Sequence, residues 1–117
     1  MPTSVLLVDD HASFRNAARM LLELEGYEVV GEAVDGEDGI RAAAALRPDL
    51  VLLDVQMPGI DGFEVAARLT EGGDGPAVIL VSSQDGADFG PLLERSGARG
   101  FITKAELSGD RIRALAA

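Results

Sequence analysis

The sequence predicts an α/β fold in which five parallel strands form one sheet that helices cover on both faces. Three observations support this prediction. Four-residue apolar runs at positions 5–8, 50–53 and 78–81 are typical of strands that are buried on both faces. Segments with apolar residues three and four positions apart, which are typical of helices, lie between these runs. The strand-helix order repeats along the chain, and this repetition favours a parallel sheet joined by right-handed crossovers.

The first half of the chain contains two predicted strand-helix units. The first strand runs into a pair of aspartates and is followed by a helix that Gly26 ends. The apolar residues of this helix recur at helical spacing: Phe14, Ala17, Ala18, Leu21 and Leu22. Residues 28–34 are expected to form the second strand. An alanine-rich helix is expected over residues 36–46, before Pro48, because proline cannot continue a helix.

The second half contains three further units. The third strand, residues 50–53, runs into Asp54, and a loop rich in turn residues, 57–62, leads to the next helix. The apolar residues of that helix are Phe63, Val65, Ala66 and Leu69. After a glycine-rich link, the remaining elements are expected as a strand at 78–81, a helix near 91–95, a strand at 100–103, and a last helix with Ser108 as its N-cap.

Composition excludes several classes of protein. The 117 residues suit a single domain over positions 1–117, and the lack of cysteine excludes disulfide scaffolds and thiolate metal sites. A net charge of −10 argues against direct contact with nucleic acid, which depends on Lys and Arg. No apolar run approaches the roughly 18 residues of a membrane span, and no basic signal region begins the sequence. We therefore expect a cytoplasmic domain without membrane contact.

Five polar residues end predicted strands: Asp9, Asp10, Asp54, Ser82 and Lys104. The carboxyl ends of parallel strands share one edge of a sheet, which is where such sheets bind ligands. Carboxylates about 5 Å apart repel by roughly 3 kcal/mol per pair at an effective dielectric constant of about 20. A core does not need such a cluster, whereas Mg²⁺ prefers oxygen ligands of this kind.

The same residues suit phosphoryl transfer. One carboxylate could attack phosphorus while Lys104 and the Ser82 hydroxyl bind the oxygens of the transferred group. Lys104 is the only lysine of the chain, beside nine arginines, and a compact charge on a flexible stem differs from a guanidinium. His11 adjoins the two aspartates, and we expect it to begin the first helix as a surface residue.

Four motifs then resemble one family. They are Val8-Asp9-Asp10, Leu53-Asp54-Val55-Gln56-Met57-Pro58-Gly59, Val81-Ser82-Ser83 and Gly100-Phe101-Ile102-Thr103-Lys104. In this order and spacing they resemble the receiver domains of two-component response regulators, over essentially the whole chain. The resemblance implies a flavodoxin-like (βα)5 sandwich whose five-stranded parallel sheet has the order 2-1-3-4-5; that order is also a known example of the doubly wound folds.

The resemblance also implies a role for each polar residue at the strand ends. Asp54 would accept a phosphoryl group from the phosphohistidine of a sensor histidine kinase or phosphotransfer protein. Asp10 and Asp54 would ligate Mg²⁺ through their side chains, Gln56 through its backbone carbonyl, and Asp9 through water. Lys104 would pair with Asp54 before phosphorylation and with the phosphoryl oxygens afterwards. The domain would be a phosphoacceptor with slow self-dephosphorylation rather than an enzyme.

The resemblance further implies a switch and a contact surface. Ser82 would move towards the phosphoryl group, and the ring of Phe101 would turn into the space that Ser82 leaves. The surface from the fourth to the fifth helix is compatible with a homodimer. Gln56 and Gln84 stand at two positions that tune access of the hydrolytic water, and Ala105 replaces the proline that often follows the lysine. The glycine-rich stretch 85–91 predicts a short or late fourth helix.

Other interpretations remain open at this point. The two aspartates could cap the first helix. An aspartyl phosphatase of the haloacid dehalogenase type also uses Mg²⁺ on an α/β sheet, but such enzymes have a second aspartate where this chain has Gln56. A noncatalytic flavodoxin-like binding module is the third alternative.

Overall fold

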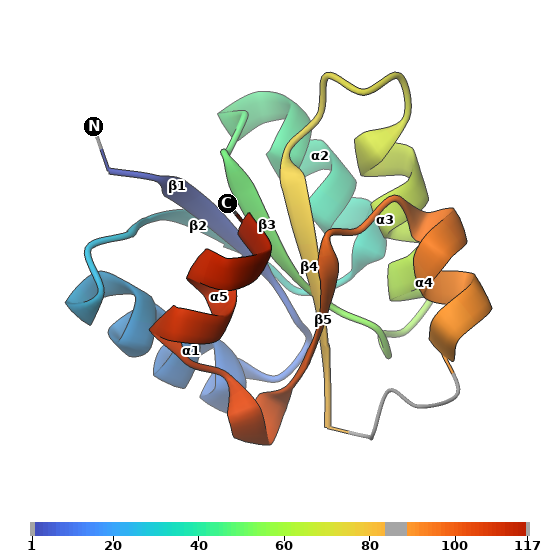
Figure 1. Cartoon of the computed structure of the whole chain (residues 1–117). Helices are drawn as coiled ribbons and strands as arrows, with labels where there is room; N and C mark the ends of the chain where they lie inside the picture. Colours follow the sequence, from blue (N-terminus) through green and yellow to red (C-terminus); the bar gives the residue numbers. More distant parts are fainter. Residues whose placement is uncertain (1, 84–88, 117) are drawn as a thin grey trace.

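The computed structural model describes residues 2–83 and 89–116, so Gln84 and most of the stretch before the fourth helix lie outside the described residues. Five strands form one parallel sheet in the order β2-β1-β3-β4-β5 (Figure 1), which confirms the predicted fold class and strand order. The strands are β1 (Ser4–Val8), β2 (Glu28–Ala33), β3 (Leu50–Asp54), β4 (Ala77–Ser82) and β5 (Gly100–Thr103).

Helices alternate with the strands, as predicted. They are α1 (Ala12–Leu24), α2 (Gly36–Leu46), α3 (Gly62–Thr70), α4 (Gly90–Ser96) and α5 (Gly109–Ala116), with a 3-10 turn η2 (Lys104–Glu106) before α5. The α4 helix is short, as the glycine-rich stretch before it indicates. The Ser108 hydroxyl accepts a hydrogen bond from the backbone N–H of Arg111, so Ser108 caps α5 as predicted. No helix among the described residues is long and apolar enough to cross a membrane.

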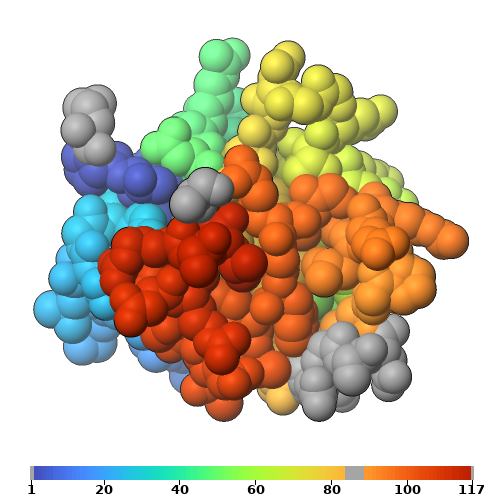
Figure 2. Space-filling view, in the orientation of Figure 1, coloured from blue at the N-terminus to red at the C-terminus, as the bar shows by residue number. Residues whose placement is uncertain are grey.

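The sheet separates two hydrophobic cores because successive strand residues point to opposite faces. On one face, Val5 and Leu7 of β1 pack with α1 and α5 through residues such as Leu22 and Ile112. On the other face, Leu6 and Val8 pack with α2, α3 and α4. In the space-filling view α5, in red, lies over the front of the molecule, with α4, in orange, to its right (Figure 2).

The strand register decides which strand ends meet. Val8 of β1 pairs with Leu53 of β3, so the residue after Val8 is level with the last residue of β3. Ser82 of β4 pairs with Thr103 of β5 at the same edge. Four strands therefore deliver their terminal side chains to one edge of the sheet.

Gly62, the first residue of α3, lets that helix begin directly against the end of β3. A Cβ atom at this position would overlap the carbonyl oxygen of Asp54 and the Cα of Val55, and both are backbone atoms that cannot turn aside. The Gly62 N–H also donates a hydrogen bond to the Val55 carbonyl at 2.9 Å.

Gly62→Ala should therefore destabilise the domain by about 1–3 kcal/mol, the usual cost of forcing an extra methyl group into a packed site. Gly109→Ala is the matched control, since Gly109 is also the first residue of a helix and a Cβ there meets only the side chain of Glu25, which is flexible and can move away. We expect Gly109→Ala to stay within about 0.5 kcal/mol of wild type in urea denaturation. Equal effects of the two substitutions would contradict the packing argument.

Candidate functional site

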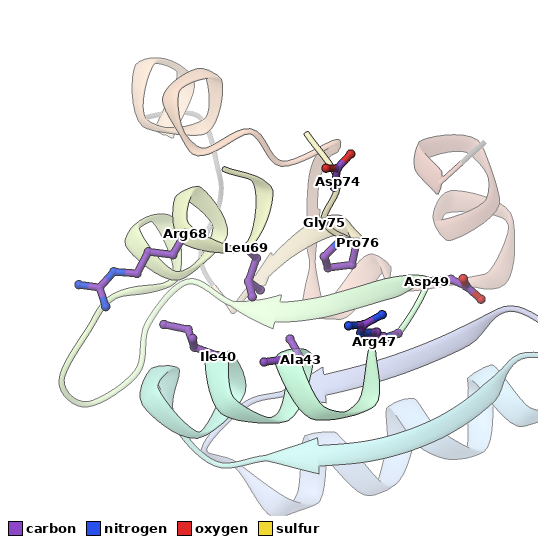
Figure 3. Close-up of a pocket in the computed structure, with 11 residues that line it drawn as sticks. Ile40, Ala43, Arg47, Asp49, Arg68, Leu69, Asp74, Gly75 and Pro76 are labelled. Atoms are coloured by element: carbon purple, nitrogen blue, oxygen red, sulfur yellow. The ribbon is translucent and has the colours of Figure 1, made fainter. Parts of the chain in front are cut away.

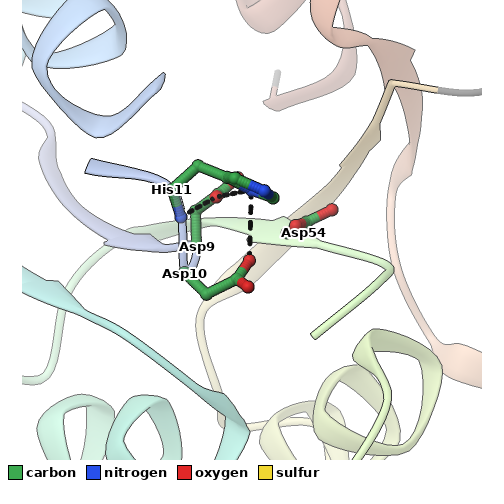
Figure 4. Close-up of side chains that lie close together, drawn as sticks. All are labelled: Asp9, Asp10, His11 and Asp54. Atoms are coloured by element: carbon green, nitrogen blue, oxygen red, sulfur yellow. Dashed lines mark hydrogen bonds and ion pairs between the residues drawn. The ribbon is translucent and has the colours of Figure 1, made fainter. Parts of the chain in front are cut away.

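Three carboxylates meet at the carboxyl edge of the sheet (Figure 4). Asp9 follows β1 and Asp54 ends β3, and only 1% and 2% of their surfaces are exposed. Asp10 lies at the rim, with 30% of its side chain exposed. One ligand atom from each of these carboxylates and from His11 lies within 4.8 Å of the others. The three acidic members of the cluster are the aspartates that the sequence predicts there.

The arrangement differs in one detail from the expectation. With the first and third strands as neighbours, Asp10 is expected to face Asp54, whereas the register places Asp9 level with Asp54 and Asp10 one residue further on. The Asp9 N–H still donates to the Ala33 carbonyl of β2, so the sheet continues through Asp9. The chain turns after Asp9, and this turn leaves Asp10 half-exposed beside the buried pair.

Lys104 is the cation of this cluster. It follows β5 directly, and only 16% of its side chain is exposed. Its Nζ lies 3.6 Å from Asp54 Oδ2, as the resemblance implies, but closer to Asp9 Oδ2, at 2.7 Å. The ammonium group also lies 4.5 Å from the centre of the Phe14 ring of α1, at the distance of a cation–π contact. The peptide bond between Lys104 and Ala105 is trans.

One lysine does not neutralise three carboxylates. Burial, and then the negative charge of Asp9, raise the pKa of the Asp54 carboxyl above its ordinary value of 3.8. The Gln56 N–H, which donates to Asp54 Oδ1 at 3.2 Å, and the charge of Lys104 offset these effects only in part. Ionised Asp54 is therefore held in a site that disfavours its charge.

The donor atoms suit a hard divalent cation. The buried Oδ2 atom of Asp9 accepts no hydrogen bond from residues 2–83 or 89–116; Lys104 faces it as an ion pair without hydrogen-bond geometry. Asp10 and Asp54 add carboxylate oxygens within the same 4.8 Å. A cluster of oxygen donors with excess negative charge, partly open to solvent at Asp10, is the chemistry that Mg²⁺ selects while it keeps several waters.

His11 is closer to the site than the prediction of a surface residue indicates. It does stand at the start of α1, as its N-cap, and 63% of its side chain is exposed. Its Nδ1 nevertheless lies 3.2 Å from Asp9 Oδ1 and 3.2 Å from Asp10 Oδ1 (Figure 4). Asp9 Oδ1 also accepts the His11 N–H at 2.7 Å. Its place in the sequence next to the aspartates was the available signal.

Ser82, Phe101 and Gln56 are the other residues to which the resemblance gives a role. Ser82 is fully buried at the end of β4, and Gln56 is exposed on the loop after β3. Phe101 of β5 is half-buried and meets Phe89 edge to face, with ring centres 5.6 Å apart. Phe89 meets Phe63 of α3 in the same way at 5.3 Å. The Phe101 ring is therefore connected through Phe89 to the start of α3.

A second hollow lies at the opposite edge of the sheet. It has a volume of about 790 Å³, and Ile40, Ala43 and Leu69 form part of its wall between α2 and α3 (Figure 3). Its charged side chains, Arg47, Asp49, Arg68 and Asp74, are all exposed. Because none of the described residues that line this hollow is a buried polar group that could fix a ligand, the acidic cluster is the better candidate site.

Comparison with known proteins agrees with this geometry. The family model of the response regulator receiver domain matches residues 5–116. The response regulator GacA of Pseudomonas aeruginosa is 39% identical over 112 residues, which are 95% of this chain and 52% of that protein. BvgA of Bordetella pertussis, described as a transcription regulator of virulence factors, is 42% identical over 106 residues, 91% of this chain and 51% of BvgA. The chain thus spans about half the length of the curated relatives it matches.

Solved structures give the same result. The receiver domain of the response regulator NarL from Mycobacterium tuberculosis has a TM-score of 0.85 and 33% identity, over 97% of this chain and 96% of that one. A LuxR-family response regulator from Aurantimonas has a TM-score of 0.88 and 30% identity, over 99% and 86%. Since sequence, fold and acidic edge agree, the chain belongs to the response regulator receiver domain family and is the receiver domain of a two-component response regulator.

Proposed function

We propose that Asp54 is the phosphoacceptor of this receiver domain and that Mg²⁺ bound at the acidic edge is required for the transfer. The observation that carries the proposal is the position of Asp54: a buried carboxylate, ending a central strand, beside two further carboxylates and one lysine. A receiver domain is a phosphoacceptor and not an enzyme, so it needs one such carboxylate to accept the phosphoryl group.

In the proposed reaction an oxygen of ionised Asp54 attacks the phosphorus of a phosphohistidine on a histidine kinase or phosphotransfer protein. The new O–P bond forms as the P–N bond breaks, and the bond electrons leave with the imidazole nitrogen, which takes a proton. Asp54 becomes a mixed anhydride. Water later attacks the phosphorus, which releases phosphate and restores the carboxylate. The Gln56 N–H, which donates to Asp54 Oδ1, fixes the orientation of the attacking carboxylate.

Asp10 and Asp54 would hold Mg²⁺ through their side chains, Gln56 through its carbonyl, and Asp9 through water. When bound, the ion would offset the repulsion among the carboxylates and the charge that develops on the phosphoryl oxygens. Lys104 supplies a second positive charge from β5, and it can turn from its ion pair with Asp9 and Asp54 to the phosphoryl oxygens because its stem is flexible.

Signal output is proposed to pass through Ser82 and Phe101. A hydrogen bond from the Ser82 hydroxyl to the phosphoryl group would be worth roughly 1.5–3 kcal/mol, enough to shift a two-state population tenfold or more. The Phe101 ring, in contact with Phe89, would then repack the surface from α4 to α5, which is where a homodimer could form. The names of the relatives favour control of transcription as the output, exerted without nucleic-acid contact by this acidic domain.

The first test is direct phosphorylation. Incubation with acetyl phosphate and Mg²⁺ should add about 80 Da, one phosphoryl group, to the intact mass. Asp54→Asn should abolish this gain, while Asp61→Asn, which changes an exposed carboxylate that caps α3, should retain it. A gain of mass in Asp54→Asn, or none in wild type, would contradict the assignment.

The second test is the stability of Asp54→Asn. The raised pKa means that protonated Asp54 stabilises the fold below the ordinary value of 3.8, and this contribution is lost as the pH rises through the folded-state pKa. At pH 7 without Mg²⁺, Asp54→Asn should therefore be more stable than wild type by roughly 1 kcal/mol, or about 4 °C or more in Tm.

The difference in stability between Asp54→Asn and wild type should also depend on pH and on Mg²⁺. The difference in stability should shrink as the pH falls through the raised pKa of Asp54, because wild-type Asp54 then takes up the proton that relieves its buried charge. Added Mg²⁺ should raise the Tm of wild type by ligand linkage and raise that of Asp54→Asn less. A constant difference in Tm from pH 4 to pH 7 would contradict the account of Asp54.

A further inference from the structure

Arg15, on the first turns of α1, reaches back to the acidic edge. Its Nη1 donates a hydrogen bond of 2.6 Å to the backbone carbonyl of Asp9, and its Nε donates one of 2.9 Å to Glu32 Oε1 on β2. The Arg15 side chain is 15% exposed and that of Glu32 is 27% exposed. These are charge-assisted bonds in a partly buried setting, where they are stronger than at an open surface.

Arg15 and strand β2 together fix the backbone of Asp9. The Asp9 N–H bonds to the Ala33 carbonyl of β2 at 3.0 Å, one residue beyond the end of β1. The Asp9 carbonyl bonds to Arg15, which is itself anchored on Glu32, the residue before Ala33. Both backbone polar groups of Asp9 are thus tied to the end of β2, the N–H directly and the carbonyl through Arg15. The Asp9 and Asp10 side chains, which belong to the acidic cluster, extend from this fixed stretch of backbone.

The guanidinium group explains how one residue makes both bonds. It presents its N–H donors in a fixed planar fork, so it can bond a carboxylate and a carbonyl at the same time without loss of alignment. Arg19 is a useful comparison, because it also pairs with Glu32, at 3.0 Å, and with Glu23, at 3.5 Å. Within the part of the chain that the structure describes, Arg15 bonds to the acidic edge and Arg19 bonds only to glutamates.

We propose that Arg15 is a positioning residue: it fixes the backbone of Asp9 and thereby presets the carboxylates of Asp9 and Asp10 for a divalent cation. Glu32 is the anchor that holds Arg15 in place. The proposal rests on the function proposed above, in which this edge binds Mg²⁺ and Asp54 is phosphorylated. It adds a second layer of residues that none of the four family-like motifs contains.

The test compares Arg15→Gln with Arg19→Gln in the full 117-residue chain. Each substitution removes one arginine from Glu32, but only Arg15→Gln releases the Asp9 carbonyl. Mg²⁺ affinity is measured by calorimetry at a temperature well below both Tm values, and the rate of phosphorylation by acetyl phosphate is measured at saturating Mg²⁺. Loss of outer residues that orient ligands commonly weakens metal binding 10- to 100-fold.

We expect Arg15→Gln to bind Mg²⁺ about tenfold more weakly than wild type, and Arg19→Gln to stay within about twofold. Equal Mg²⁺ affinities in the two variants would overturn the proposal. Should Arg15→Gln not fold, Glu32→Ala decides, since it keeps Arg15 but removes the oxygen that anchors it: weaker Mg²⁺ binding supports the positioning role, and wild-type binding refutes it. Failure of the wild-type chain itself to bind Mg²⁺ or to be phosphorylated would instead refute the function proposed above.

Discussion

The site depends on one electrostatic constraint: a single ammonium group, that of Lys104, faces three carboxylates at the edge of the sheet. Two of these carboxylates are almost fully buried, and Lys104 lies 2.7 Å from one and 3.6 Å from the other. Like charges brought together out of water cost free energy that hydrophobic burial elsewhere must offset. The two apolar cores on the faces of the sheet supply that burial. The fold therefore maintains an excess of negative charge that a cation, or the loss of one charge, would relieve.

The surrounding elements hold the charged groups at fixed places. Gly62 lets α3 begin against the backbone of Asp54, and α1 contributes Phe14 beneath Lys104 and Arg15 on the Asp9 carbonyl. Strands supply the reacting groups, and helix starts restrain them. Strand ends that hold repelling charges in fixed places are well suited to a switch. A modest new hydrogen bond can shift the equilibrium between two conformations when their free energies are similar.

Much of the fold could be predicted from the sequence. Buried parallel strands have continuous apolar runs, and the helices between them have apolar residues at helical spacing. The strand order could not be derived in this way and came from the resemblance to receiver domains. The polar residues at strand ends could also be found, since each follows an apolar run directly. His11 could have been suspected from its place next to the aspartates, but its contacts depend on how the chain turns between Asp10 and α1. The contribution of Arg15 could not be found, because it depends on which side of α1 faces β2.

The most direct test of the account is a crystal structure of the chain grown with Mg²⁺ and beryllofluoride, which mimics an aspartyl phosphate. The account predicts a beryllofluoride group on the Asp54 carboxylate, Mg²⁺ beside it with Asp10 as a ligand, and Lys104 turned from Asp9 towards the fluorides. Crystals with an empty acidic edge, and with Lys104 still paired to Asp9 and Asp54, would contradict the claim that this charge cluster exists to bind a metal and a phosphoryl group.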